Sequence, residues 1–165
     1  MLSSRFLLLP FALQVICMAF DELYFHRRRV MAKWERLGHP LDTLTVIICL
    51  VWLLLAQPNS TNLLVYAILG IFSTIFITKD EWQHQKYCES GEHWLHALLF
   101  VLHPLVLIAA GLLWYAKQPG EIHRLISYDG WEFYQLMAGC LMIFGCGIYQ
   151  LLYWNIRWKT SKVPR

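Results

Sequence analysis

The sequence predicts an all-α, polytopic membrane protein, a bundle of about five transmembrane helices. Of its 165 residues, 58% are hydrophobic and only 15% are charged, whereas soluble domains carry about 25% charged residues. Apolar segments close to the length of about 20 residues that spans a bilayer recur along the chain. We therefore predict one integral membrane domain over residues 1–165, with spans at roughly 6–24, 41–56, 63–78, 92–115 and 131–154.

The first two spans are joined by a basic connection. Pro10 lies near the outer end of the first span, where a proline disturbs a helix least. Arg27-Arg28-Arg29 follows this span, and then comes an apolar stripe typical of a short helix lying in the membrane interface. We expect Gly38 to end that short helix and Pro40 to open the second span, since proline is favoured in the first turn of a helix.

Turn residues separate the remaining spans. Gln57-Pro-Asn-Ser-Thr61 is a turn between the second and third spans. Ser90-Gly91 breaks the helix after the third span, and Ser90 is the expected N-cap of the fourth. The fifth span, 131–154, carries tryptophan and tyrosine at both ends. These residues are enriched where a transmembrane helix crosses the two membrane–water interfaces.

The distribution of Lys and Arg predicts the orientation. Eleven of the 14 lie in the connection between spans one and two, the connection between spans three and four, and the C-terminal segment. Because cytoplasmic loops carry the excess of positive charge, we predict an N-terminus outside and a C-terminus in the cytoplasm. The expected location is a bacterial inner membrane. A net charge of only +3 gives no indication of nucleic-acid binding. The expected partner of this membrane protein is membrane lipid.

Small residues in the last two spans permit close helix packing. They are Ala109-Ala110-Gly111 in the fourth span and Gly139, Gly145 and Gly147 in the fifth. One interpretation is packing within the bundle, and the other is contact in a homodimer or with a partner membrane subunit. Four of the five cysteines lie in apolar segments, so we predict no disulfide framework. Cys88 alone lies among polar residues.

Acidic and histidine side chains gather on the predicted cytoplasmic side, and together they predict a metal site there. Six of the seven histidines lie on this side, and only His123 does not. The layer consists of Asp21, Glu22, His26, His39, Asp42, Asp80, Glu81, His84, Glu92, His93 and His96, with His103 deeper in the fourth span. Solvation of charged helix ends, without any site, is the alternative interpretation.

Helical spacing places several of these side chains on shared faces. At about 100° per residue, Glu22 and His26 fall within about 40° of each other, and Glu92, His96 and His103 share a similar arc. Glu92 and His103 are nevertheless about 16 Å apart along the helix axis. One metal ion cannot bind both, so we expect either a binuclear site or a metal site with an additional histidine that supports the ligands or lies on a proton path.

The turn at Ser90-Gly91 makes the third and fourth spans an antiparallel hairpin. Residues whose numbers sum to about 180 then lie level with each other. This register predicts that His84 and His96 lie side by side.

The types of ligand predict the metal. Mixed carboxylate and imidazole ligands favour iron or manganese over a structural zinc site, which more often uses thiolates. We expect two iron ions, with manganese or zinc as alternatives, and no haem, because His103 is the only well-buried histidine. The predicted ligands are Glu22, His26, Glu81, His84, Glu92 and His96, with His39 and His103 as further candidates. We expect four further residues to orient these ligands by hydrogen bonds without binding the metal: Asp21, Asp42, Asp80 and His93.

Two short motifs resemble known di-iron proteins. Glu81-Trp-Gln-His84 resembles the Glu-x-x-His element of ferritin-like di-iron carboxylate sites, while Glu22 to His26 and Glu92 to His96 depart from it by one residue. His93-Trp-Leu-His96 resembles a histidine box of the membrane fatty-acyl desaturases and hydroxylases, although their paired His-His is missing. These resemblances imply a di-iron oxygenase or desaturase-like oxidoreductase.

The expected function is therefore a membrane-embedded di-iron oxidoreductase that acts on a lipid, acyl or quinone substrate from the cytoplasmic face, supplied by an electron donor. One alternative is a zinc-dependent membrane hydrolase, in which histidines hold zinc and an acid activates water. A further alternative is a non-enzymatic accessory or metal-handling subunit, which suits the small size of the chain. The sequence does not define catalytic residues.

Overall fold

The computed structural model describes residues 2–28, 31–127 and 130–157. This part of the chain is a helical bundle in which five helices are long and apolar enough to cross a membrane. Their bounds are Ser4–Arg28, Lys33–Leu55, Ser60–Lys86, Ser90–Tyr115 and Trp131–Arg157. The five long helices predicted from the sequence are thus present, and most extend beyond their predicted ends.

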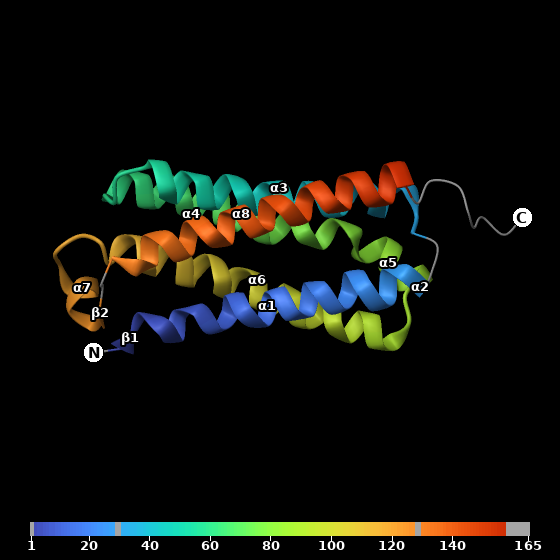
Figure 1. The fold of residues 1–165 in the computed structure, drawn as a ribbon, viewed down its shortest axis with the longest axis horizontal. Helices are drawn as coiled ribbons and strands as arrows, with labels where there is room; N and C mark the ends of the chain where they lie inside the picture. Colours follow the sequence, from blue (N-terminus) through green and yellow to red (C-terminus); the bar gives the residue numbers. More distant parts are fainter. Residues whose placement is uncertain (1, 29–30, 128–129, 158–165) are drawn as a thin grey trace, which may run out of the picture.

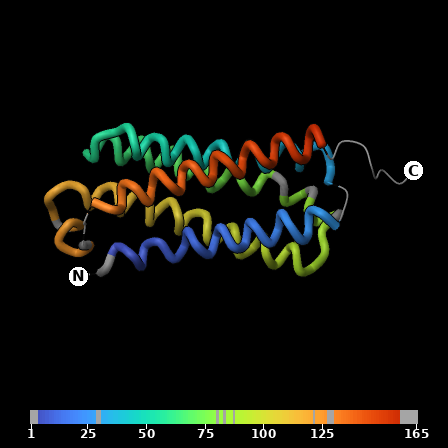
Figure 2. Tube along the Cα trace, in the orientation of Figure 1, coloured from blue at the N-terminus to red at the C-terminus, as the bar shows by residue number. Residues whose placement is uncertain are grey.

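Successive long helices run in alternate directions along the bundle (Figure 1). α1 (Leu9–Phe20) packs along α6 (Ser90–Tyr115), and α3 (Lys33–Leu55) packs along α8 (Trp131–Leu152). α4 (Ser60–Phe76) joins the two pairs because it contacts both α3 and α6. Figure 2 follows the same path and shows that the first and last long helices begin and end at opposite ends of the bundle, as an odd number of antiparallel helices requires.

The first long helix is not uniform. A short 3-10 turn, η1 (Ser4–Leu8), precedes α1, and a π-helical turn, η2 (Asp21–Phe25), joins α1 to α2 (His26–Arg28). A second π-helical turn, η4 (Tyr153–Arg157), follows α8 at the same end of the bundle. Single π turns of this kind occur frequently at functional sites.

α3 differs from the expected break between a short interfacial helix and a second span. The prediction that Gly38 ends a helix is wrong, because α3 begins at Lys33 and continues through Gly38 and Pro40. Pro40 has no N–H, so the carbonyl of Arg36 loses its helical partner. Asn155 of η4 supplies the replacement, since its Nδ2 donates to the Arg36 carbonyl at 3.1 Å. A tertiary contact therefore supports the helix across its proline.

The remaining elements are short. α4 continues through the 3-10 turn η3 (Ile77–Asp80) into α5 (Glu81–Tyr87). Glu89, and not Ser90 as expected, is the N-cap of α6. At the far end lie α7 (Glu121–Leu125) and two strands, β1 (Leu2–Ser3) and β2 (Ile126–Ser127), which pair in parallel. All five cysteines are free thiols.

The apolar core lies between α3, α4, α6 and α8, away from the polar end. Its contacts are close, because the Tyr66 hydroxyl donates to the Leu107 carbonyl at 2.6 Å and the Tyr66 ring lies against Gly111. Large apolar side chains cover much of the outer surface, which suits lipid surroundings. The buried cluster consists of Val46, Cys49, Leu50, Leu53, Tyr66, Leu107, Ala110, Trp114, Leu136 and Cys140.

Candidate metal centre

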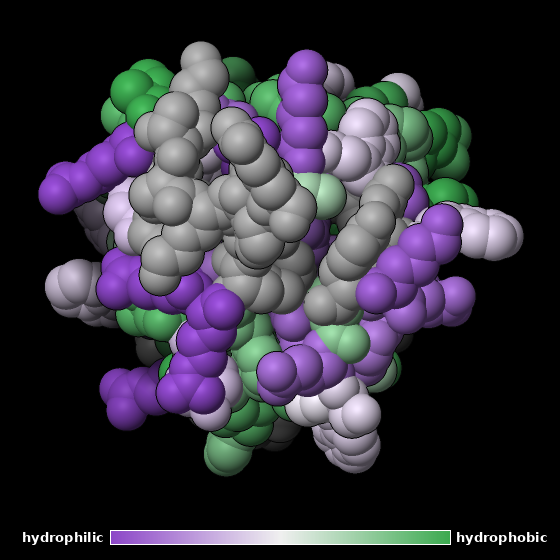
Figure 3. Space-filling model, turned by 90° about the vertical axis from the view of Figure 1, so that its right-hand side faces the viewer, coloured by the Kyte–Doolittle hydropathy of each residue, from purple (hydrophilic) through white to green (hydrophobic). Residues whose placement is uncertain are grey.

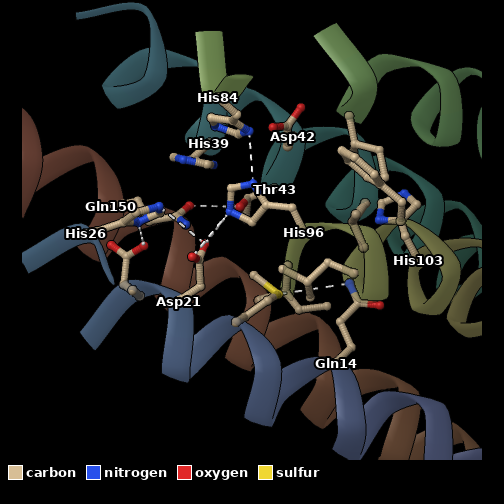
Figure 4. A pocket seen from close by; sticks show the side chains of 17 residues that line it. Gln14, Asp21, His26, His39, Asp42, Thr43, His84, His96, His103 and Gln150 are labelled. Carbon is tan, nitrogen blue, oxygen red and sulfur yellow. Dashed lines mark hydrogen bonds and ion pairs between the residues drawn. The ribbon is translucent and has the colours of Figure 1, made fainter. Parts of the chain in front are cut away.

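Buried imidazoles and carboxylates meet at the end of the bundle where α1 ends and where α3 and α6 begin (Figure 4). They surround one end of a cavity of about 120 Å³. The side chains at this polar end come from η2, α2, α3, α5 and α6, so the site needs four of the five long helices. The predicted layer of acids and histidines is therefore a buried cluster in the folded chain.

The π turn η2 shapes the first part of the cluster. The backbone N–H of His26 bonds to the carbonyl of Asp21, five residues earlier. In a regular α-helix these two side chains would point about 140° apart, but the wider π turn brings them onto one face. As a result, Nε2 of His26 lies 3.3 Å from Oδ2 of Asp21.

α6 completes the first ligand group. Nε2 of His96 lies 3.3 Å from both carboxylate oxygens of Asp21, and Oε1 of Glu92 lies 3.7 Å from Nε2 of His26. One ligand atom from each of Asp21, His26, Glu92 and His96 lies within 4.8 Å of the others, and all four residues are buried. We call this set ligand group A.

α3 and α5 form a second set, which we call ligand group B: Glu35, His84 and Cys88. Nε2 of His84 lies 3.1 Å from Oε1 of Glu35. The other carboxylate oxygen of Glu35 accepts the backbone N–H of Ala32 at 3.2 Å, which holds the side chain at the start of α3. Groups A and B share no residue.

His84 and His96 join the two groups. Their Nδ1 atoms lie 2.9 Å apart, which confirms the side-by-side pairing expected from the hairpin register. A hydrogen bond between two ring nitrogens holds one proton, so one ring donates and the other accepts. The Nε2 atoms of the two rings belong to different groups, His84 to group B and His96 to group A.

His39 lies between the two groups. Its ring centroid is 4.8 Å from that of His26 and 6.1 Å from that of His84. His39 also forms a candidate ligand set with His26 and Glu35, in which one ligand atom of each residue lies within 4.8 Å of the other two. Nε2 of His39 is buried and has no hydrogen-bond partner in the described part of the chain. It is therefore available to either group.

Glu22 lies behind His26 and not among the atoms of group A. Its Oε2 accepts the Nδ1–H of His26 at 3.1 Å, and its Oε1 accepts the indole N–H of Trp154. A carboxylate on Nδ1 fixes the histidine tautomer that presents the Nε2 lone pair to a metal. Trp154 is almost fully buried in η4 and also meets the His26 ring edge to face. The two π turns therefore meet through this hydrogen bond.

Other predicted site residues lie outside the two groups. Glu81 is at the rim, with a side chain 35% exposed and Oε2 4.0 Å from Nδ1 of His84. His93 is half-buried, and its Nδ1 lies 3.9 Å from Oε1 of Glu81. Asp42 forms an ion pair with Lys79 at 2.6 Å. The side chain of Asp80 lies outside the described part of the structure.

His103 lines the same cavity at a deeper level. Its Nε2 lies 3.0 Å from the hydroxyl of Ser73. None of the candidate ligand groups found among the described residues includes His103. The structure thus separates His103 from the ligands with which the sequence grouped it.

The sequence interpretation overlooked Glu35 and Trp154. Glu35 was placed in a separate interfacial helix, but the continuous α3 puts it one turn before His39 on the same face. The Glu-x-x-x-His spacing of Glu35 and His39 recurs at Glu22 and Glu92, each four residues before a histidine. This threefold recurrence was the available signal. Trp154 carried no comparable signal, because a π turn directs its side chain inward.

Comparisons of the chain with protein-family models, curated proteins and solved structures found no match.

Proposed function

We propose that this chain is a membrane-embedded metalloprotein with two metal positions, and that it is a di-iron oxidoreductase acting on a lipid-soluble substrate. One observation carries the proposal: two ligand groups, A and B, buried except for the half-buried Cys88, share no residue and are joined by the contact between His84 and His96. Each group offers at least three ligand atoms within 4.8 Å. Two adjacent positions of this kind suit two ions better than one.

The charges of the site support cations. Four carboxylates are buried in and behind the ligand groups, those of Asp21, Glu22, Glu35 and Glu92. Burial of carboxylates is unfavourable unless neighbouring groups balance the charge. Two divalent ions carry four positive charges, the same number as the negative charges of these side chains.

The contact of His84 with Glu35 supports a cation in group B. If His84 gives its Nδ1 proton to the hydrogen bond with His96, its neutral ring presents a lone pair at Nε2. That lone pair faces a carboxylate oxygen at 3.1 Å, and Nε2 has no hydrogen-bond partner among the described residues. Two acceptors at this distance repel each other, and a metal ion bound by both removes the repulsion.

The ligand set and the cavity support iron and an apolar substrate. Group A contains only carboxylates and imidazoles, the ligands of di-iron carboxylate proteins. Bound iron would supply one-electron and dioxygen chemistry. The chain's own residues would hold it: Glu22 and Trp154 orient His26, and His39 offers a further nitrogen. Apolar side chains that suit a lipid-soluble molecule form much of the remaining cavity wall: Met18, Val46, Ile77, Leu99, Phe100 and Ile143.

The charge distribution supports a cytoplasmic location of the site. Figure 3 views the end of the bundle that carries the site, where hydrophilic side chains form much of the rim. Because basic residues concentrate on the cytoplasmic side of membrane proteins, we assign this end to the cytoplasm. The basic residues described at this end are Arg27, Arg28, Lys33, Arg36, Lys79, Lys86 and Arg157, against Arg5, Lys117 and Arg124 at the other.

A zinc-dependent hydrolase is the second candidate, and group B favours it. Cys88 adds a thiolate to a histidine and a carboxylate there, and thiolate ligands favour zinc. A single zinc ion in group B with a bound water would give hydrolytic chemistry and not redox chemistry.

Elemental analysis of the detergent-purified protein tests the proposal. We expect about two irons per chain, and loss of the metal when His84 and His96 are both replaced by alanine. His123→Ala is the matched control, because His123 lies at the opposite end of the bundle and bonds to the Ala116 carbonyl. Full metal content in the double variant would refute the site, and one zinc per chain would favour the hydrolase.

A further inference from the structure

Gln14 and His103 line the same cavity, farther along the bundle from its polar end than the ligand groups (Figure 4). α1 and α6 pack against each other in opposite directions, and Asp21 meets His96 at 3.3 Å. Gln14 lies seven residues before Asp21, and His103 lies seven residues after His96. Seven residues are about two helical turns, or roughly 10 Å. Both side chains therefore lie at the same level and on the same helix faces as the pair above them.

The hydrogen bonds around His103 determine its tautomer. The Thr45 hydroxyl donates its one hydrogen to the carbonyl of Asp42 at 2.7 Å. The Ser73 hydroxyl, 2.7 Å from Thr45, must then donate to Thr45. Ser73 has no second hydrogen, so it accepts at 3.0 Å from the Nε2–H of His103. Nδ1 of His103 therefore carries a lone pair, on a ring that lines the cavity.

Gln14 presents a second acceptor. Its Nε2 donates to the sulfur of Met18 at 3.9 Å. Its Oε1 is buried and has no hydrogen-bond partner within the described ranges. Two acceptors, one on α1 and one on α6, thus line one end of the cavity.

These acceptors indicate the chemistry of a ligand. A buried acceptor without a partner, as Oε1 of Gln14 is among the described residues, costs about 1–3 kcal/mol. A molecule that donates to this oxygen recovers that free energy, and a second donor on the same molecule can bond to Nδ1 of His103. The walls between the acceptors are apolar, formed in part by Leu99, Phe100 and Ile143. The whole cavity, including the part beside the ligand groups, has a volume of about 120 Å³. An apolar cavity of about 150 Å³ accommodates a benzene ring, so this cavity has room for about one ring. A ring with two hydroxyl groups combines these properties.

We infer that this end of the cavity binds the head group of a hydroquinone-class lipid. One hydroxyl donates to Nδ1 of His103 and the other donates to Oε1 of Gln14. The inference rests on the proposed function, since it names the substrate class of the cavity that adjoins the two ligand groups. An ordered water at either acceptor is the competing occupant, and it needs no ring.

Calorimetric titration of the purified, metal-loaded protein under argon tests this inference. The probes are a hydroquinone with a decyl chain and its dimethyl ether, which has the same ring and chain but no donor. We expect the hydroquinone to bind at least tenfold more tightly than the ether, since each lost hydrogen bond is worth about 1 kcal/mol. Equal binding of the two probes, or binding of neither, would overturn the inference.

Variants locate the binding site. His103→Phe keeps a ring without the acceptor, and Gln14→Leu keeps the approximate volume. We expect each to weaken hydroquinone binding about fivefold, the effect of one hydrogen bond worth about 1 kcal/mol, while the metal content stays at the wild-type value. Leu105→Ala is the control on α6, because Leu105 is exposed on the outer surface. Unchanged hydroquinone binding in both variants would overturn the inference and leave the proposed metal site intact. Absence of bound metal from the purified wild-type protein would instead overturn the proposed function.

Discussion

His84 and His96 meet through their Nδ1 atoms at 2.9 Å, and this contact joins the two ligand groups. One ring comes from α5 and the other from α6, so the hairpin between them brings the groups together. Two neutral imidazoles carry two ring protons. One lies between the Nδ1 atoms, and the other remains on one of the Nε2 atoms.

This arrangement predicts that the two metal ions bind with unequal affinity. The first ion takes the Nε2 atom that carries a lone pair, whereas the second must displace the remaining proton. We expect stepwise binding in calorimetric titration, and the second step should release more protons than the first. Titrations in buffers of different ionisation enthalpy measure that release. A single step with both ions equivalent would contradict the shared proton.

Single substitutions should empty the two positions separately. Asp21→Asn removes a carboxylate of group A, and Glu35→Gln removes one of group B. We expect each variant to keep about one metal ion per chain and the double variant to keep none. Inductively coupled plasma mass spectrometry gives the content. If each single variant loses both ions, the two groups form one site.

Glu22 should affect metal affinity without binding metal. Its carboxylate fixes the tautomer of His26, and loss of such a contact typically lowers metal affinity 10- to 100-fold. We therefore expect Glu22→Gln to retain metal at saturation but to release it at lower chelator concentrations. Trp154→Phe should produce a smaller effect in the same direction. Trp131→Phe, at the other end of α8, is the control and should leave the chelator profile unchanged.

The support of α3 across Pro40 can be measured with a double-mutant cycle. Asn155→Ala leaves the Arg36 carbonyl without its donor and should lower the free energy of unfolding by about 1 kcal/mol. In a Pro40→Ala background the residue at 40 has an N–H that can bond to Arg36, so the same substitution should have almost no effect. Thermal unfolding in detergent measures all four proteins. Equal losses in both backgrounds would show that Asn155 acts elsewhere.

Gly111 is required by the close approach of Tyr66. A Cβ at position 111 would lie 2.8 Å from Cε1 of the Tyr66 ring. We expect Gly111→Ala to destabilise the protein by about 1–3 kcal/mol through overpacking. Gly139→Ala is the matched control, since a Cβ there meets nothing within 4 Å, and it should be neutral or slightly stabilising. Loss of stability in both variants would mean that helix geometry, and not contact with Tyr66, is responsible.

The sequence by itself was enough to predict the number of long apolar helices, the gathering of acids and histidines at one end, and the pairing of His84 with His96. These features follow from hydropathy, from helical periodicity and from a short turn, all of which are local along the chain. Only the tertiary structure decided which carboxylates face the imidazoles and which lie behind them. Asp21 faces the imidazoles and Glu22 lies behind them because a π turn departs from 100° per residue, and no local pattern marks that turn.

The same reason explains Glu35. Gly38 and Pro40 are local signals for a break, yet α3 continues through both because Asn155, 119 residues after Arg36, supplies the missing hydrogen bond. Contacts between residues distant in sequence also placed Trp154 on Glu22 and Gln14 level with His103. The periodicity of the chain thus determined which helices form, whereas their packing determined which side chains face one another.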